Sequence, residues 1–352
     1  MTPPRRVLVA RFSALGDVAM AVPVVYGVCR ANPGTEFILL TKLPTASLWV
    51  NPPANLTVVG ADMKKQYAGL RGTVTLFNEL YHRYRFDAMA DLHQVLRTRI
   101  MALLCRMRAI KVATISKGRR EKAALCRTKT VSSPLPTSAQ RYEAVFASLG
   151  LATDTRSGSV LGAEGSSPAL FADISSPKLP GERWIGIAPF AAHSTKIYPT
   201  DQMEKVVAEL SARKGTKVFL FGGGDTERAL LSQWASRYPG VKSLADRRHG
   251  FAKELALMAS LDCMVAMDSG NMHLASIAGT PVVSIWGATH PAMGFTPAGF
   301  DAAHALQSPL SCRPCSVFGE KPCSRGDMAC MNAISPYQII DTIDNLLNGR
   351  RF

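Results

Sequence analysis

Long apolar runs, acidic residues and aromatic side chains are all scarce in this sequence. No stretch approaches the ~18 consecutive apolar residues that a transmembrane helix requires. Asp and Glu number 26 against 41 Lys and Arg, which gives a formal net charge of +15, and aromatic residues make up only 7% of the chain. The first shortage argues against an integral membrane protein. The charge imbalance favours a polyanionic partner, such as nucleic acid, an anionic membrane surface or a phosphorylated substrate.

The excess positive charge is concentrated in one stretch. Residues 97–130 carry eleven Lys or Arg side chains and a single acidic residue, Glu121. This stretch has no aromatic residue on which a base could stack, so nucleic acid is disfavoured as the partner. Two interpretations stay open: a solvated face, or a surface for a phosphorylated, membrane-embedded acceptor. In the second case Arg119 and Arg120 are candidate acceptor-binding residues.

The beginning of the chain bears on cellular location. Its first residues, MTPPRR, lead into a short apolar strand pattern rather than into the apolar region of a secretory signal. We therefore expect a cytoplasmic protein, with peripheral contact to the inner membrane as an open alternative.

The apolar pattern indicates an α/β protein. A chain of 352 residues suggests two domains on a prior of ~150 residues each. In both halves short apolar runs alternate with helical patterns, which is typical of a parallel sheet with helices on both faces. A Ser-, Gly- and Pro-rich segment spans 153–183. We predict a Rossmann-like acceptor-binding domain at 1–160, a second Rossmann-like domain at 161–335 that binds the nucleotide-linked substrate, and a terminal amphipathic helix within 336–352.

Three turns that follow predicted strands in the second half carry residues suited to a phosphate. The carboxyl ends of parallel strands share one edge of a sheet, so these turns could meet. A helix N-terminus after such a turn adds backbone N–H groups and a positive dipole end. The candidate nucleotide-sugar-binding residues are Ser194, Thr195 and Lys196 in the first turn, Gly223, Gly224, Asp225 and Glu227 in the second, and Asp268, Ser269, Gly270 and His273 in the third.

The matching turns in the first half place an acid beside polar groups. Asp17 follows the first predicted strand, and the residues alone favour a helix-terminal acid that interacts with the dipole. The functional alternative is a general base that activates a sugar hydroxyl. Arg11 and Ser13 in the same turn, and His93 after a later strand, are candidate acceptor-binding residues.

Four of the eight cysteines cluster near the C-terminus with the spacing C-x2-C-x7-C-x6-C. Four thiolates at such spacing suit Zn²⁺ or an iron–sulfur centre. A disulfide or four reduced thiols are the alternatives. The residues concerned are Cys312, Cys315, Cys323 and Cys330.

Three segments resemble glycosyltransferase family 9, the ADP-heptose:lipopolysaccharide heptosyltransferases. They are RFSALGD at 11–17, IGIAPFAAHSTKIYP at 185–199 and DSGNMHLASIAGTPVVSIWGATHP at 268–291. The resemblance implies a GT-B fold, in which two Rossmann-like domains face each other across a cleft and a terminal helix packs back on the N-terminal domain. It also implies an inverting, metal-independent transfer from a nucleotide sugar, with ADP-heptose favoured, to an anionic lipopolysaccharide-core or lipid A acceptor. No cofactor would be required for catalysis.

The resemblance also implies roles for single residues. Asp17 would be the base that deprotonates the acceptor hydroxyl. The remaining roles concern the donor: Thr195 and Lys196 on its phosphates, Gly270 and His273 at the pyrophosphate end, Asp268 on the sugar, and Glu227 or Asp225 on the ribose.

Two other functions remain open at this point. One is an epimerase-type enzyme that binds a nucleotide sugar in the same fold without an acceptor. The other is a non-enzymatic nucleic-acid-binding protein that uses the basic stretch and a four-cysteine metal site.

Overall fold

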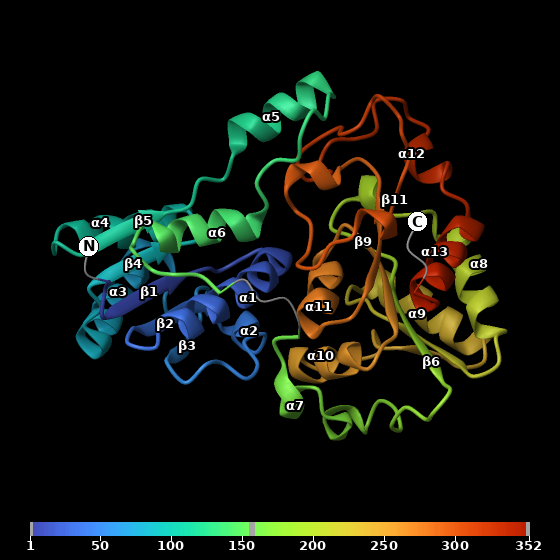
Figure 1. Cartoon of the computed structure of the whole chain (residues 1–352), viewed down its shortest axis with the longest axis horizontal. Helices are drawn as coiled ribbons and strands as arrows, with labels where there is room; N and C mark the ends of the chain where they lie inside the picture. The colour runs from blue at the N-terminus through green and yellow to red at the C-terminus, as the bar shows by residue number, and fades with distance from the viewer. Residues whose placement is uncertain (1–2, 155–158, 350–352) are drawn as a thin grey trace. The chain divides into compact units, whose positions relative to one another are not determined.

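The structure is a computed structural model that describes residues 3–154 and 159–349 (Figure 1). The chain forms two compact units. The first unit comprises residues 1–117 and 136–160, and the second comprises residues 118–135 and 161–352. Residues 118–135 therefore belong to the second unit, although the chain on both sides of them belongs to the first.

The first unit is built on a five-stranded parallel sheet in the order β3-β2-β1-β4-β5. Its central strand is an uninterrupted apolar run, and Val7, Leu8, Val9 and Ala10 are completely buried. Such runs form strands that are covered on both faces. The strands are β1 (Arg6–Ala10), β2 (Glu36–Lys42), β3 (Leu56–Ala61), β4 (Ala88–Asp91) and β5 (Lys111–Thr114).

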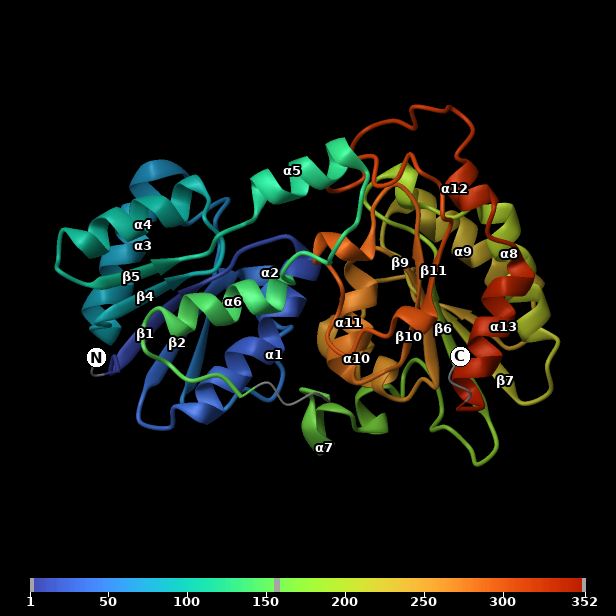
Figure 2. The same ribbon diagram turned by 45° about the horizontal axis from the view of Figure 1, so that its top comes forward.

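Two pairs of helices flank the first sheet. Helices α1 and α6 pack on each other, and α3 packs on α4 (Figures 1 and 2). The apolar side chains of α3 and α4 form one core with β1, β2 and β4. The helices are α1 (Leu15–Ala31), α2 (Leu43–Ala46), α3 (Gly69–Tyr84), α4 (Leu96–Arg106) and α6 (Ser138–Ala147).

The second unit contains a six-stranded parallel sheet in the order β11-β10-β9-β6-β7-β8. Its apolar core includes the buried faces of β6, β7, β9 and β10 together with several helices. The strands are β6 (Arg183–Ala188), β7 (Thr216–Leu220), β8 (Val241–Ser243), β9 (Cys263–Met267), β10 (Val282–Trp286) and β11 (Ala305–Gln307).

The connections in the second unit are mostly helical. Glycine at the end of α11 has φ +85°, a left-handed conformation that ends the helix where the sequence reads Gly-Thr-Pro. The α-helices are α5 (Arg119–Thr128), α7 (Gly162–Gly165), α8 (Thr200–Ser211), α9 (Asp225–Arg237), α10 (Phe251–Ala259), α11 (Gly270–Ala278), α12 (Ala329–Asn332) and α13 (Pro336–Leu347). The 3-10 helices are η1 (Pro168–Phe171), η2 (Ser194–Lys196), η3 (Pro291–Met293) and η4 (Ala302–His304).

Each sheet contains a point where the strand order reverses. In the first unit the chain leaves β1 through α1 toward β2 and leaves β4 through α4 toward β5, on the other side. In the second unit β6 leads to β7 and β9 leads to β10 in the same divergent way. The carboxyl ends of such a strand pair border a crevice in which doubly wound proteins bind ligands. The predicted α/β class with two Rossmann-like domains is thus confirmed.

Helix α5 is anchored in the second unit by apolar and cation–π contacts. Leu125 packs on Met293, and the Lys122 ammonium lies 3.9 Å from the centre of the Phe295 ring. Both partners follow β10 in the chain and belong to the second unit. The basic stretch at 97–130 is therefore divided: α4 lies in the first unit and α5 in the second.

Helix α13 also belongs to the second unit. Its Ile339, Ile340 and Ile343 side chains are buried in the core that contains α8 and the second sheet (Figures 1 and 2). Arg213 donates from Nη1 to Asp344 Oδ1 at 2.6 Å and fixes the far end of the helix. The resemblance implied that this helix packs back on the first domain, whereas its apolar face is occupied within the second unit.

None of the helices in the described ranges is long and apolar enough to span a bilayer.

Replacing Ile343 by Ala is expected to lower the free energy of unfolding of the second unit by about 2–5 kcal/mol, since a fully buried side chain would leave a cavity. Urea unfolding followed by tryptophan fluorescence measures this, because Trp184, Trp234 and Trp286 all lie in this unit. The control Tyr337→Ala, on the exposed face of the same helix, should change the value by less than about 0.5 kcal/mol. An unchanged transition in Ile343→Ala would contradict the packing of α13.

Candidate active site

The turns that follow β6, β9 and β10 meet at the crevice of the second sheet. Lys196 Nζ lies 3.4 Å from Asp268 Oδ2, which also accepts a hydrogen bond from Thr289 Oγ1 at 2.7 Å. All three residues are buried. The Lys196 ammonium has three N–H donors and, among the described residues, this one long contact, so it retains donors for a phosphate oxygen. The hydrogen bonds and ion pair of Asp268 with the described residues all use Oδ2, so Oδ1 can accept from a hydroxyl.

The Lys196 side chain is held in place by a neighbouring loop. Thr195 Oγ1 donates to the carbonyl oxygen of Gly319 at 2.5 Å. Gly319 has φ +82°, and a Cβ atom there would lie 2.6 Å from Lys196 Cγ. Only glycine lets the backbone approach this closely in this conformation. The loop around Gly319 therefore positions the aliphatic part of Lys196.

Helix α11 directs its N-terminus toward the same crevice. Its N-cap, Ser269, has an extended backbone, and the Ser269 Oγ atom is buried without a hydrogen-bond partner. An unpaired buried hydroxyl is costly and indicates a ligand or water that completes it. The amide groups of the first turn and the helix dipole favour an anion at this position. His273, one turn further, is buried.

The glycine-rich turn after β7 is arranged differently from the prediction. Glu227 Oε2 accepts from the amide of Gly223 at 2.7 Å and from the amide of Gly224 at 3.3 Å. The two glycine N–H groups expected to approach a phosphate are therefore occupied by a carboxylate of the chain itself. Asp225 is almost fully exposed and lies 3.6 Å from Arg228. Of this turn, only Glu227 Oε1 and Asp225 remain for a ribose.

A buried arginine that the sequence analysis did not single out organises the turn after β10. The Arg313 guanidinium donates to the carbonyl oxygens of Gly287 at 2.5 Å, Thr289 at 2.8 Å and Trp286 at 3.1 Å. Desolvation lowers its pKa below the ordinary arginine value. By satisfying carbonyls at the end of β10, Arg313 fixes Thr289 beside Asp268. In the sequence, Arg313 is marked only by its position between Cys312 and Cys315 of the cysteine cluster.

The four clustered cysteines are free thiols. Burial raises the pKa of Cys315 and Cys330, whereas the amide N–H of Met328, together with neighbouring amides, lowers the pKa of Cys323. In the part of the chain that the structure describes, no group of three or more His, Cys, Asp and Glu side chains is placed to hold a metal ion. The metal suggested for Cys312, Cys315, Cys323 and Cys330 is not supported.

In the first unit Asp17 lies in the first turn of α1, beside Arg11. Arg11 Nη2 forms an ion pair with Asp17 Oδ2, which also accepts the Ala14 amide at 3.3 Å. Asp17 Oδ1 makes no contact within the described ranges, and the side chain is 31% exposed. One oxygen is thus fixed and the other is open to a proton. This arrangement is compatible with both roles considered for Asp17, a helix-terminal acid and a general base.

Arg11 is buried and links the ends of β1 and β4. Its Nη1 donates to the carbonyl oxygen of Leu92 at 2.6 Å, and its guanidinium lies 5.6 Å from the centre of the Tyr142 ring. Arg11 therefore orients Asp17 from inside the fold and has little surface left for an acceptor.

His93 is fixed in one neutral form. The Phe12 amide donates to Nδ1 at 3.4 Å, so the ring proton lies on Nε2, 3.4 Å from Ser13 Oγ. Desolvation, with further contributions from Arg11, Lys117 and Lys42, lowers the pKa of His93 to about 3. His93 is therefore uncharged at neutral pH and can orient Ser13 by donating to it.

Ser13 and His93 line a cavity of about 570 Å³ in the first unit. Its charged lining residues are three cations, Lys42, Lys64 and Arg97, and one carboxylate, Asp62. Arg97 is fixed by bonds to Tyr67 and Thr73, whereas the ammonium groups of Lys42 and Lys64 make no ion pair with the described residues. The two lysines were not among the predicted site residues, although Lys42 ends β2 and Lys64 follows β3 at the carboxyl edge of the sheet, where Asp17 follows β1.

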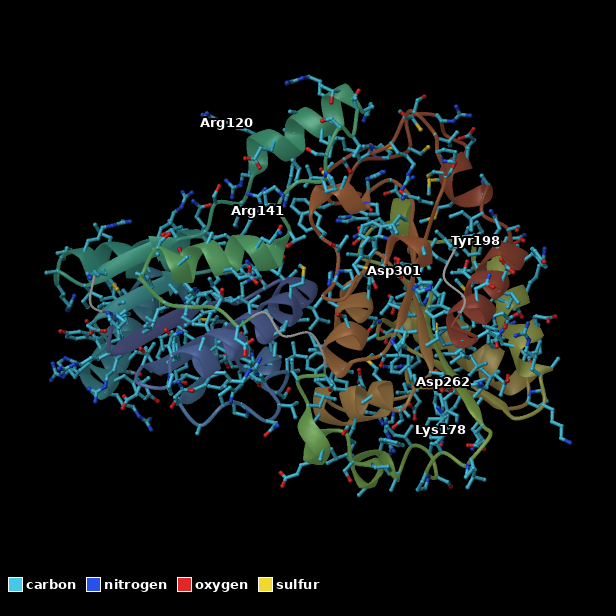
Figure 3. The ribbon with its side chains drawn as sticks, in the orientation of Figure 1. Arg120, Arg141, Lys178, Tyr198, Asp262 and Asp301 are labelled. Carbon is cyan, nitrogen blue, oxygen red and sulfur yellow. The ribbon has the colours of Figure 1, made fainter. Side chains whose placement is uncertain are left out.

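Arg119 and Arg120 lie on α5, in the second unit, and are exposed. Figure 3 shows the Arg120 side chain extending away from the helix. The structure thus does not place them in the same compact unit as Ser13 and His93.

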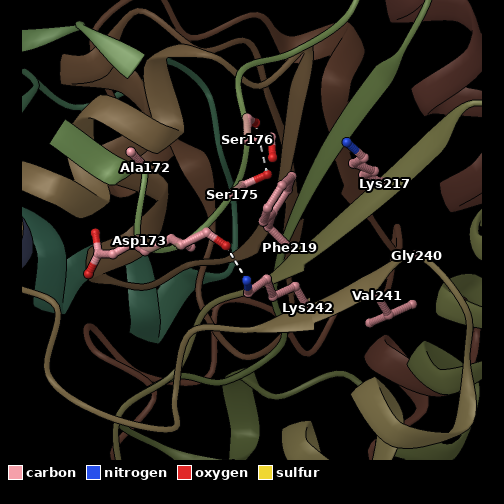
Figure 4. Close-up of a pocket in the computed structure, with 10 residues that line it drawn as sticks. Ala172, Asp173, Ser175, Ser176, Lys217, Phe219, Gly240, Val241 and Lys242 are labelled. Carbon is pink, nitrogen blue, oxygen red and sulfur yellow. Dashed lines mark hydrogen bonds between the residues drawn. The ribbon is translucent and has the colours of Figure 1, made fainter. Parts of the chain in front are cut away.

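A second cavity, of about 630 Å³, lies at the opposite edge of the second sheet (Figure 4). Lys217, Gly240 and Lys242, at the amino ends of β7 and β8, line it, and Lys242 donates to the carbonyl oxygen of Ile174. Ligands of doubly wound sheets bind at the carboxyl ends of the strands. This cavity is therefore separate from the candidate active site.

Two Rossmann-like units, each with a doubly wound parallel sheet, define the GT-B fold, which solved heptosyltransferase structures share. Comparison with known proteins gives the family. The chain belongs to glycosyltransferase family 9 (heptosyltransferase), whose model matches residues 75–324. The resemblance seen in the sequence is confirmed, and the chain is an enzyme of this family. The non-enzymatic nucleic-acid-binding alternative is wrong.

Individual relatives agree with this assignment. Lipopolysaccharide heptosyltransferase 1 of Pseudomonas aeruginosa is 25% identical over 318 residues, which cover 88% of this chain and 86% of that protein. A family 9 glycosyltransferase structure from Veillonella parvula has a TM-score of 0.74 at 18% identity, with 98% of both chains covered. E. coli heptosyltransferase WaaC with ADP has a TM-score of 0.68 at 16% identity, covering 97% of this chain and 99% of that one. At these identities the two structures support the fold alone.

Stability should depend on pH through His93. Its folded pKa of about 3 lies below the ordinary 6.5, so the unfolded chain binds more protons between these values and unfolding becomes easier as pH falls below 6.5. Between pH 7.5 and 5.0 the wild type should lose about 2 kcal/mol more than His93→Gln does. Urea unfolding followed by circular dichroism at both pH values checks this, with exposed His82→Gln as the control. If the free energy of unfolding falls equally in wild type and in His93→Gln, the lowered pKa of His93 is contradicted.

Proposed function

We propose that this enzyme transfers heptose from ADP-heptose to a lipopolysaccharide-core acceptor, with inversion and without a metal ion. The observation that carries the proposal is the convergence of Lys196, Asp268 and the N-terminus of α11 at the crevice of the second sheet. The names of the relatives supply the sugar and the acceptor class: one curated relative is a lipopolysaccharide heptosyltransferase, and one structural neighbour contains ADP.

In the proposed donor complex the diphosphate lies against Lys196 and the first turn of α11. The ammonium and the amide N–H groups neutralise the charge that develops on the departing diphosphate. Thr195 holds the loop that positions Lys196. Asp268, with Oδ1 open, accepts from a sugar hydroxyl. Since a fixed ammonium and a helix dipole supply the positive charge, a divalent cation is not needed to stabilise the leaving group.

The acceptor is proposed to occupy the cavity that contains Ser13 and His93. Lys42, Lys64 and Arg97, against the single carboxylate of Asp62, give it a net positive lining that suits the carboxylates and phosphates of a lipopolysaccharide core. Arg119 and Arg120, on the other unit, remain candidates for the phosphorylated part of the acceptor. A lipid-linked acceptor also requires the enzyme to work at the membrane surface.

The proposed reaction is a single displacement. Asp17 Oδ1 takes the proton of the acceptor hydroxyl, and the hydroxyl oxygen forms a bond to the anomeric carbon of the donor. The bond between that carbon and the diphosphate oxygen breaks, and ADP leaves with the electron pair. Attack from the face opposite to the diphosphate inverts the anomeric configuration. Arg11 keeps the carboxylate oriented throughout.

Replacing Asp17 by Asn should lower transfer by about 10²-fold or more, because the amide cannot accept the proton. The assay supplies ADP-heptose and deacylated core acceptors in EDTA, with exposed Asp201→Asn as the control that should keep full activity. Full activity in Asp17→Asn would remove Asp17 as the base. Absence of transfer by the wild type would show that the proposed donor or acceptor is wrong.

Replacing Gly319 by Ala should weaken ADP binding about tenfold, because the added Cβ displaces Lys196 at a cost of ~1–3 kcal/mol. Gly326→Ala is the matched control: its φ of +78° is close to the +82° of Gly319, but nothing lies within 4 Å of its Cβ position. Calorimetric titration of both variants with ADP measures the affinities. A loss in Gly319→Ala beyond that in Gly326→Ala is due to the collision with Lys196 and not to backbone strain. Equal affinities in the two variants would contradict the placement of the diphosphate at Lys196.

A further inference from the structure

Helix α4 has an apolar stripe on its outer face. It consists of Leu96, which begins the helix, Leu103 within it and Met107 directly after it. These side chains are 76%, 56% and 73% exposed, respectively. Their spacing of seven and four residues places them on one side of a helix, with half-buried Ile100 between them. The opposite side, with Met101 and Cys105, is completely buried. The helix is therefore apolar on two faces, of which the core uses only one.

The outer stripe is bordered by positive charge. Arg99 and Arg106 are exposed and follow one edge of it, seven residues apart. Arg108, just past the end of α4, is exposed and lies over Phe77 of α3. No Asp or Glu occurs from residue 92 to residue 120. Within residues 92–120 the stripe is thus apolar in its centre and flanked by cationic side chains alone.

The same helix reaches the proposed acceptor cavity. Arg97, in the first turn of α4, lines that cavity and is anchored by donating to the carbonyl oxygen of Tyr67 at 2.7 Å. Leu70, on α3 between the Arg97 partners Tyr67 and Thr73 in the sequence, is also exposed, at 62%. Figures 1 and 2 show α3 and α4 side by side on one face of the first sheet. The cavity and the exposed stripe are therefore parts of one surface of the first unit.

We propose that the outer face of α4 is a membrane-docking surface that inserts Leu96, Leu103 and Met107 among the headgroups of an anionic bilayer. A helix with an apolar face and flanking arginines lies in such an interface, because the guanidinium groups reach the phosphates while the apolar side chains leave water. Docking this way would place the cavity at the membrane surface, where a lipid-linked acceptor is found. The membrane binding itself is argued from α4 alone. Its use, which is to bring the enzyme to a lipid-linked acceptor, rests on the proposed function.

A bilayer fits these features better than a protein partner does. A protein interface rich in leucine and methionine usually pairs specific charges, whereas the charges of α4 itself have one sign and spread along the helix. Each basic residue near an anionic leaflet adds to binding regardless of its exact position. The surface thus matches a fluid array of negative headgroups.

The test is sedimentation of the full-length protein with vesicles, without donor or acceptor. We expect binding to phosphatidylcholine vesicles that contain about one third phosphatidylglycerol, and at least about tenfold weaker binding to phosphatidylcholine alone. The variant Leu96→Ser with Leu103→Ser and Met107→Ser should lose at least about tenfold in vesicle binding. Arg99→Gln with Arg106→Gln should lose about as much on the anionic vesicles only.

Matched controls remove exposed residues of the same kinds in the second unit. Leu179→Ser with Tyr337→Ser, and Lys205→Gln with Lys214→Gln, should bind vesicles like the wild type. Transfer to a water-soluble acceptor, measured separately, should be unchanged in every α4 variant, so failure of docking and failure of the proposed reaction are distinguishable. Wild-type binding in the α4 variants would overturn the proposal. Stripe-dependent self-association without vesicle binding would also overturn it, in favour of a protein interface.

Discussion

The structure depends on one constraint: in each parallel sheet, two neighbouring strands send their connections in opposite directions. Helical crossovers between parallel strands are right-handed, so they leave no helix over the carboxyl ends of β1 and β4 or of β6 and β9. Polar residues can occupy these open ends without breaking the apolar core. Asp17 and His93 lie at the first, and Lys196 and Asp268 lie at the second. The strand order therefore determines where polar site residues can lie.

Buried arginines turn these open ends into defined geometry. Arg11 binds the carbonyl at the end of β4 and the carboxylate of Asp17, and Arg313 binds three carbonyls at the end of β10. Charged groups removed from water must be paired and hydrogen-bonded, which makes their positions strict. Arg11 orients Asp17 and Arg313 orients Thr289, and both guanidinium groups are buried.

The sequence predicts the fold well, because short apolar runs such as those of β6 and β9, bounded by turn residues and alternating with helical patterns, indicate buried strands. The turns after these two strands contain Lys196 and Asp268. It predicts less where a contact joins distant segments. Gly319, 124 residues from Thr195, has no periodic signal, and Lys42 and Lys64 look like ordinary surface lysines. Glu227 was expected at a ribose because nothing in Gly-Gly-Gly-Asp reveals that its carboxylate caps the glycine amides. The basic stretch is divided between two units for the same reason: Leu125 finds its partner beyond residue 290.

The central claim is that the donor diphosphate binds at the crevice of the second sheet. The most direct measurement is a crystal structure of the protein with ADP. Diphosphate oxygens are expected within hydrogen-bonding distance of Lys196 Nζ and of amide groups in the first turn of α11, with Ser269 Oγ gaining a partner. A diphosphate bound to the glycine turn after β7, with Glu227 displaced and Lys196 still on Asp268 alone, would contradict it.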